Sequence, residues 1–151
     1  AMSMGDAATL FMLQVGPAMT FGGKELGASE SESVDIAGSL TVLQDMGSVK
    51  GGLTLGGVAG KKGYAAYGVP TLGWRGHFGT SGVQSLKSLG VGLAYSNDRL
   101  GVAVRGAYDI FLGGFTNFGV GLLGLVPVSG TKDKSPLNGA VDLHIGISFG
   151  R

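Results

Sequence analysis

Alternation of apolar residues with small or polar ones runs through most of this 151-residue sequence, and it constrains the fold more than any other feature. In residues 100–113, Leu100, Val102 and Val104 occupy alternate positions, with glycine and alanine between them. Such alternation places successive side chains on opposite faces of a β-strand. Helices are poorly supported, because the 31 glycines are spread along the chain and each costs up to about 1 kcal/mol relative to alanine in a helix.

Eight runs of this kind predict eight strands, separated by turn residues. They are Thr9–Phe21, Ser33–Gln44, Val49–Gly60, Tyr64–Phe78, Ser88–Ser96, Leu100–Gly113, Phe115–Val128 and Gly139–Phe149. The connecting segments are too short for the crossover helix that parallel pairing needs, so an antiparallel meander is expected. Closure into a barrel removes the two edges that an open meander exposes. We therefore predict an all-β fold with a single domain, 1–151, forming an eight-stranded antiparallel up-and-down β-barrel.

The distribution of charge decides which face of the barrel meets solvent. Only 14% of the residues are charged, against roughly 25% in a typical soluble domain. The charged residues within the predicted strands all fall on the polar face: Asp35, Lys50, Arg75, Arg105, Asp109 and Asp142. They are too few for the water-facing wall of a soluble barrel but suit a narrow lumen. A charge facing lipid would cost about 2–4 kcal/mol at the bilayer midplane. We therefore expect the apolar face to point outward to lipid, with Lys87 at the rim, before the strand that starts at Ser88.

Aromatic residues on the apolar face supply an independent indication. An even number of strands places both termini at one end, and the aromatic residues then form two groups. Phe21, Tyr64 and Tyr95 lie far from the termini, and Phe11, Trp74, Phe78, Phe118 and Phe149 lie near them. Two belts of aromatic residues at the two membrane interfaces are typical of outer-membrane barrels.

Several segments carry a resemblance to a known group of proteins. They are residues 141–149 (VDLHIGISF), 90–95 (GVGLAY) and 100–108 (LGVAVRGAY). In this pattern, which covers nearly the whole chain, the sequence resembles the small eight-stranded outer-membrane β-barrel proteins of Gram-negative bacteria. The resemblance implies a location in the bacterial outer membrane and contact with bilayer lipids, or with detergent after extraction. It implies a non-enzymatic role, either structural or in passing or binding a small solute through a narrow polar lumen. Neither a cofactor nor a nucleic-acid partner is expected.

Polar residues of the inner face are the candidate site. We predict that Asp35, Lys50, Arg75, His77, Arg105, Asp109, Asp142 and His144 line the lumen as a hydrogen-bonded network, because unpaired buried charges are costly. Glycines on the same face leave room for water or a slender ligand. No metal site is expected, since the chain has no cysteine and its two histidines should lie at different heights.

Two other functions stay open from the sequence. One is a soluble closed barrel of lipocalin or avidin type, with the apolar face inward around a hydrophobic ligand. The other is an outer-membrane enzyme that modifies lipid, because Asp142, His144 and Ser148 share one face of the last strand. Residues two apart on a strand are about 6.5–7 Å apart, however, and no Gly-x-Ser-x-Gly motif occurs. We therefore predict no catalytic residue.

Overall fold

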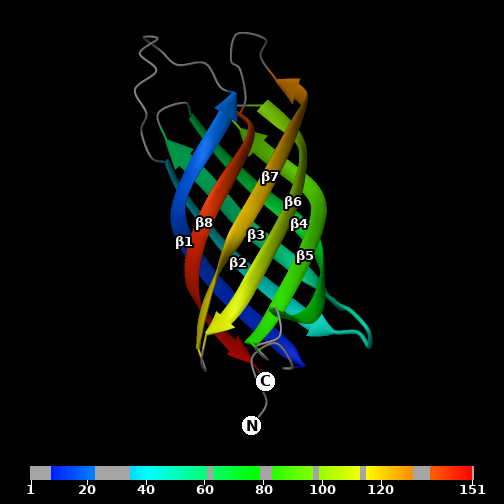
Figure 1. Cartoon of the computed structure of the whole chain (residues 1–151). Coiled ribbons are helices and arrows are strands. Elements are labelled where there is room, and N and C mark those ends of the chain that lie inside the picture. Colours follow the sequence, from blue (N-terminus) through cyan, green and yellow to red (C-terminus); the bar gives the residue numbers. More distant parts are fainter. Residues whose placement is uncertain are drawn as a thin grey trace.

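The computed structural model describes residues 8–22, 35–60, 63–78, 83–96, 99–112, 115–130 and 137–150. Each described range contains a strand, as the alternation predicts (Figure 1). The strands are β1 (Thr9–Gly22), β2 (Asp35–Asp45), β3 (Lys50–Gly60), β4 (Gly63–Phe78), β5 (Val83–Ser96), β6 (Arg99–Leu112), β7 (Thr116–Gly130) and β8 (Leu137–Gly150). Within these ranges no helix is long and apolar enough to cross a membrane.

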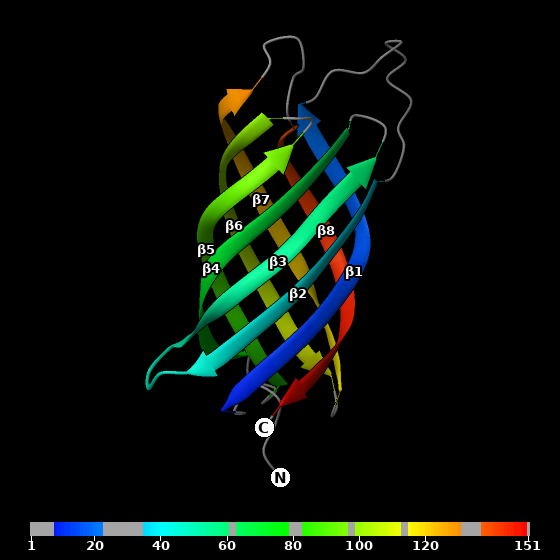
Figure 2. The same cartoon turned by 180° about the vertical axis from the view of Figure 1, so that it is seen from behind.

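Each strand pairs antiparallel with the next, and β8 returns to pair with β1 (Figures 1 and 2). The predicted all-β class and the closed eight-stranded up-and-down barrel are therefore confirmed. The largest difference in bounds concerns β5, which begins at Val83 rather than Ser88. Lys87 consequently lies within β5, on its outward face. The prediction that Lys87 comes just before the strand was wrong.

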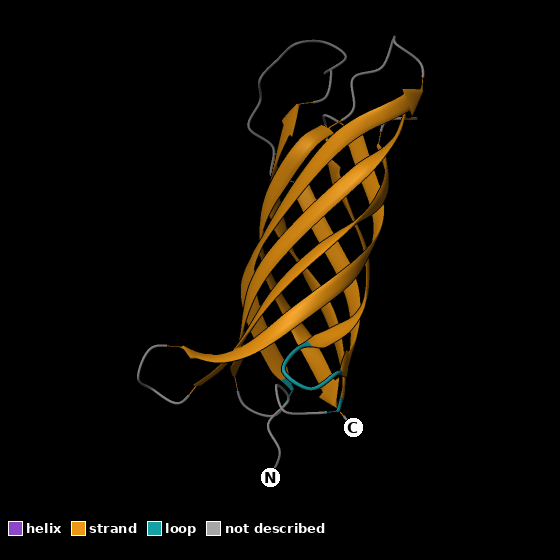
Figure 3. Cartoon of the chain, turned by 90° about the vertical axis from the view of Figure 1, so that its right-hand side faces the viewer, coloured by secondary structure: helices purple, strands orange, loops and turns teal. Residues whose placement is uncertain are grey.

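The two ends of the barrel differ. β1 begins and β8 ends at the same end, which we call the terminal end; the opposite end is the distal end (Figure 1). The connections at the terminal end are residues 46–49, 79–82 and 113–115. Those at the distal end include the two longest links of the chain, residues 23–34 and 131–136. The β4–β5 hairpin projects sideways from the terminal end (Figure 3).

The faces of the barrel are inverted relative to a soluble protein. Outward positions carry large apolar side chains, and Leu93 (64% exposed), Ile145 (56%) and Leu13 (52%) represent them. Inward positions carry buried polar groups such as Gln14 and Thr54. The prediction that the apolar face points outward is therefore confirmed. The lipocalin-type alternative, which needs the apolar face inside, is wrong for this fold.

Side chains fill the lumen in layers. Near the terminal end, an apolar layer consists of Leu10, Met12, Leu43, Leu86 and Phe111, each at most 6% exposed. A second apolar layer lies nearer the distal end, and its buried members are Ala18, Val58, Ala65, Val69, Ala94, Ala103, Leu125 and Ala140. The buried polar residues of mid-barrel lie between these layers. Eight strands enclose a space that side chains can fill, so this interior is a packed core.

Candidate functional site

His144 is the centre of the polar layer. It is an inward residue of β8 and is only 3% exposed. Its Nε2 lies 2.5 Å from Oδ1 of Asp109 on β6, and its Nδ1 lies 2.7 Å from Oδ2 of Asp142, two residues earlier on β8. Ionised carboxylates only accept hydrogen bonds, so this arrangement is satisfied when the imidazole is protonated and donates from both nitrogens. The group is an Asp–His–Asp bridge across the lumen.

Amide side chains extend this bridge toward the first and seventh strands. The Nε2 group of Gln14 donates to Oδ1 of Asp109 (2.8 Å) and to Oδ1 of Asn117 (2.7 Å). The Nδ2 group of Asn117 in turn donates to Oγ of Ser148 (2.5 Å). The hydrogen bonds thus join β1, β6, β7 and β8. Oδ2 of Asp109 is buried and has no hydrogen-bond partner among the described residues.

Arg105 supplies the second positive charge of the layer. It is 6% exposed, and its Nε donates to the hydroxyl of Tyr67 on β4 at 3.1 Å. A cavity of about 10 Å³ lies between these two residues and the carboxylate–imidazole pair of Asp142 and His144. That volume is close to the minimum for one water molecule. The expected room for a slender ligand is therefore absent from this cavity.

The charges of the layer balance. Asp109 and Asp142 contribute two negative charges, and Arg105 and the protonated His144 contribute two positive ones. A buried charge is tolerated when it is paired and hydrogen-bonded. We name these four residues, together with Gln14, Asn117 and Tyr67, the lumen cluster.

Glycines on the inward face provide the space for the lumen cluster. A Cβ atom at Gly119 would lie 2.5 Å from Oδ1 of Asp109 and 2.9 Å from Nε2 of His144. A Cβ atom at Gly121 would collide with the carboxylate of Asp142. β7 therefore needs glycine at these two inward positions, because neighbouring strands fill the space with their polar groups.

The other predicted lumen residues lie at different levels. Asp35 is buried toward the distal end, where Oγ1 of Thr20 donates to its Oδ2 at 2.5 Å. Lys50 is buried to 1% exposure at the first residue of β3, toward the terminal end. Arg75 and His77 are exposed at the terminal end of β4. The structure separates these two from the lumen cluster, because β3 ends its pairing with β4 at Gly73, and among the described strands β4 pairs only with β5 beyond that point.

Sequence reasoning did not identify Gln14 and Asn117, which extend the hydrogen bonds of Asp109 to β1 and β7. Alternation could have found them, since both occupy inward positions of their strands and are fully or almost fully buried. Tyr67 is an aromatic residue on the polar face, and the hydrogen bond that its hydroxyl accepts from Arg105 explains that position.

The Ser-His-Asp combination on β8 does not form a catalytic triad. The hydroxyl of Ser148 accepts a hydrogen bond from Asn117, whereas both nitrogens of His144 face aspartates. The two ring nitrogens of His144 point in opposite directions, so the two carboxylates lie on opposite sides of the ring and do not face a common point. No group of histidine and acidic side chains that could hold a metal ion occurs in the part of the chain that the structure describes.

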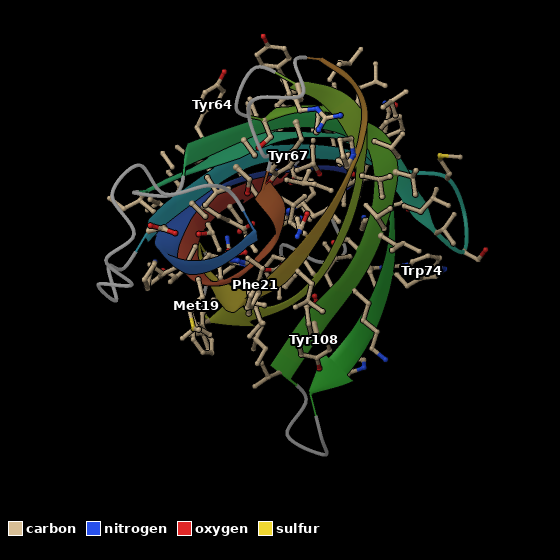
Figure 4. The ribbon with its side chains drawn as sticks, turned by 90° about the horizontal axis from the view of Figure 1, so that it is seen from above. Met19, Phe21, Tyr64, Tyr67, Trp74 and Tyr108 are labelled. Atoms are coloured by element: carbon tan, nitrogen blue, oxygen red, sulfur yellow. The ribbon has the colours of Figure 1, made fainter. Side chains whose placement is uncertain are left out.

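The aromatic residues predicted to form belts face outward where the structure describes them. Phe21, Tyr64 and Tyr95 lie toward the distal end, and the rings of Tyr64 and Tyr95 are 6.4 Å apart. Figure 4 shows Tyr64 and Trp74 outside the ring of strands and Tyr67 inside it. Toward the terminal end the outward residues are Phe11, Trp74, Phe118 and Phe149. The side chain of Phe78 lies outside the described part.

Comparisons with known proteins agree with this architecture. No protein-family model and no curated protein sequence matches the chain. Among solved structures, the crystal structure of the outer membrane protein OprG from Pseudomonas aeruginosa is similar, with a TM-score of 0.51 over 99% of this chain and 100% of that chain. The two sequences are 16% identical, a level at which the likeness concerns the fold. The chain therefore shares its fold with a small outer-membrane β-barrel, and the resemblance predicted from its sequence is confirmed.

Proposed function

We propose that this chain is an integral protein of the bacterial outer membrane and that it works as a sealed barrel rather than as an open pore. The inversion of its faces carries the proposal. Outward positions along all eight strands are predominantly apolar, with Lys87 as the one charged side chain among the described ones, and the buried charges are inside. In water, such an exterior would be a very large exposed apolar surface, which soluble monomers avoid. Hydrocarbon is the solvent that matches it.

Two further observations support this placement. The aromatic residues cluster at two heights on the outside, as in proteins whose aromatic belts mark the membrane interfaces. The fold is shared with a protein named as an outer membrane protein. Because the turns of such barrels are short on the periplasmic side, the terminal end would face the periplasm.

The filled lumen favours a structural role over solute passage. Two apolar layers close it above and below the lumen cluster, and the cavity beside Arg105 has room for about one water molecule. A conduit for even a small solute would need both layers to open. The geometry therefore supports a barrel that presents its outer surface and ends to partners, without catalysis at the lumen cluster.

Extraction tests the membrane placement. We expect the chain to fractionate with membranes, to need detergent for extraction, and to migrate differently on a gel before and after heating. A monomer that stays in solution in plain buffer would contradict the proposal.

Electrical recording tests the sealed lumen. We expect no stable single-channel conductance when the folded protein is inserted into a planar bilayer. A double variant in the terminal apolar layer, Leu86→Gly with Phe111→Gly, should remain silent, since the distal layer still closes the lumen. Regular conductance steps from the wild-type protein would overturn the sealed-barrel proposal and favour solute passage.

A further inference from the structure

Lys87 is the one charged side chain on the outward face of the strands that the structure describes. It is exposed on β5, directly opposite Trp74 on β4 and Tyr108 on β6. Opposite residues on one face have Cβ atoms about 4.5–5.5 Å apart. A cation thus lies between two aromatic residues that each carry a polar group, the indole N–H of Trp74 and the hydroxyl of Tyr108, on a surface that is otherwise predominantly apolar.

The height of Lys87 places it at an edge of the barrel wall. Pairing between β3 and β4 ends at Lys50 and Gly73, so from Trp74 to Phe78 the strand β4 pairs only with β5. This part of the hairpin leaves the wall at the terminal end (Figure 3). The cost of a charge on the lipid face falls from the midplane toward the interface. A lysine at this level can extend its ammonium group to the headgroups while its methylenes stay on apolar surface.

The sequence on either side of the turn between β4 and β5 contains basic but no acidic residues. Residues 72–90 contain Arg75, His77 and Lys87 but neither aspartate nor glutamate. Arg75 and His77 are exposed at the same end of β4, at inward positions of the alternation rather than on the face that carries Lys87. A basic, aromatic-flanked position at a membrane interface is complementary to the phosphate of an anionic lipid.

We propose that the outward face formed by Trp74, Lys87 and Tyr108 binds an anionic phospholipid of the leaflet next to the terminal end. The ammonium group of Lys87 pairs with the lipid phosphate. The rings of Trp74 and Tyr108 border the headgroup, and apolar positions farther from the terminal end, such as Leu89, contact the acyl chain. The inference rests on the membrane location proposed above and adds a preferred lipid class and a site for it.

Trp74 is the only tryptophan of the chain, so it reports on the lipid beside Lys87 without labelling. The protein is reconstituted into vesicles of phosphatidylcholine and phosphatidylglycerol in which one lipid or the other has brominated acyl chains. Bromine quenches nearby tryptophan. A basic residue near an anionic surface contributes about 1 kcal/mol, equivalent to an enrichment of about five-fold. We expect brominated phosphatidylglycerol to quench Trp74 more strongly than brominated phosphatidylcholine, in line with that enrichment.

Matched variants isolate the role of the lysine. Lys87→Gln should abolish the excess quenching by phosphatidylglycerol, and Lys87→Arg should retain it. In the double variant Trp74→Phe with Phe118→Trp, the reporter moves to an outward position of β7. There we expect both brominated lipids to quench equally.

The outcomes separate this inference from the proposed location. Equal quenching of Trp74 by the two lipids in the wild-type protein, or an undiminished excess in Lys87→Gln, would overturn the lipid site and leave the membrane location intact. Absence of quenching by either lipid would show that the protein does not enter the bilayer, and both proposals would fail.

Discussion

Removal of the Asp109 carboxylate is the sharpest test of the lumen cluster. Asp109 is 1% exposed and accepts hydrogen bonds at Oδ1 from His144 and Gln14. Asp109→Ala leaves the buried imidazolium with one counter-charge instead of two and leaves the Gln14 amide without one acceptor. Breaking a buried ion pair by deleting one partner costs about 3–5 kcal/mol. We therefore expect the free energy of unfolding to fall by about that amount.

The measurement is reversible urea unfolding in phospholipid vesicles, followed by the fluorescence of Trp74. Asp45→Ala is the matched control, because Asp45 is exposed at the end of β2 and accepts one hydrogen bond, of 3.3 Å, from the Gly47 amide. We expect it to cost less than about 1 kcal/mol. If Asp109→Ala were no more destabilising than Asp45→Ala, the lumen cluster would not be a paired, buried network and the reasoning would be refuted.

Three further predictions follow from the same geometry. Arg105→Ala should lower the melting temperature of the barrel in detergent, because it removes a buried cation of the cluster; an unchanged melting temperature would count against the network. Gly121→Ala should cost about 1–3 kcal/mol by inward overpacking, whereas Gly124→Ala, whose Cβ would lie 3.9 Å from its nearest neighbour, should be nearly neutral in the same urea experiment. Val104→Arg, near the middle of the outward face of β6, should cost about 2–4 kcal/mol in vesicles, and Leu112→Arg at its end about 0–1 kcal/mol; equal costs would contradict a bilayer around this face.

The alternation of apolar and polar residues, together with the turn residues, was sufficient to predict the fold. Successive side chains of a strand lie on opposite faces, so the alternation shows that each strand has one polar and one apolar face. The start of β5 was misplaced because Lys87 was read as a charge that a lipid-facing strand excludes. That reading ignored the interface, where a lysine is tolerated and where the β4–β5 hairpin extends beyond the pairing with β3.

The content of the lumen cluster was harder to predict than its existence. The sequence indicated that Arg105, Asp109, Asp142 and His144 face inward, but the height of a residue depends on strand tilt and stagger. Alternation does not encode these quantities. Arg75 and His77 occupy inward positions in the alternation, as the residues of the lumen cluster do, but they lie at the exposed end of β4. Gln14 and Asn117 are hydrogen-bond partners on strands that are not neighbours, β1 and β7. Such pairs depend on the stagger between strands and cannot be predicted from the spacing of residues within either strand.

The abundance of glycine is explained by the same geometry. An eight-stranded barrel encloses little space, so a polar group long enough to reach a partner in the lumen needs an empty position on a neighbouring strand. Gly119 and Gly121 supply such positions beside Asp109, His144 and Asp142. Low charge and high glycine content are therefore two consequences of one requirement. A barrel that turns its apolar face outward must confine its buried charges to a narrow interior, and it can pair them there only where glycine on the neighbouring strand leaves the space free.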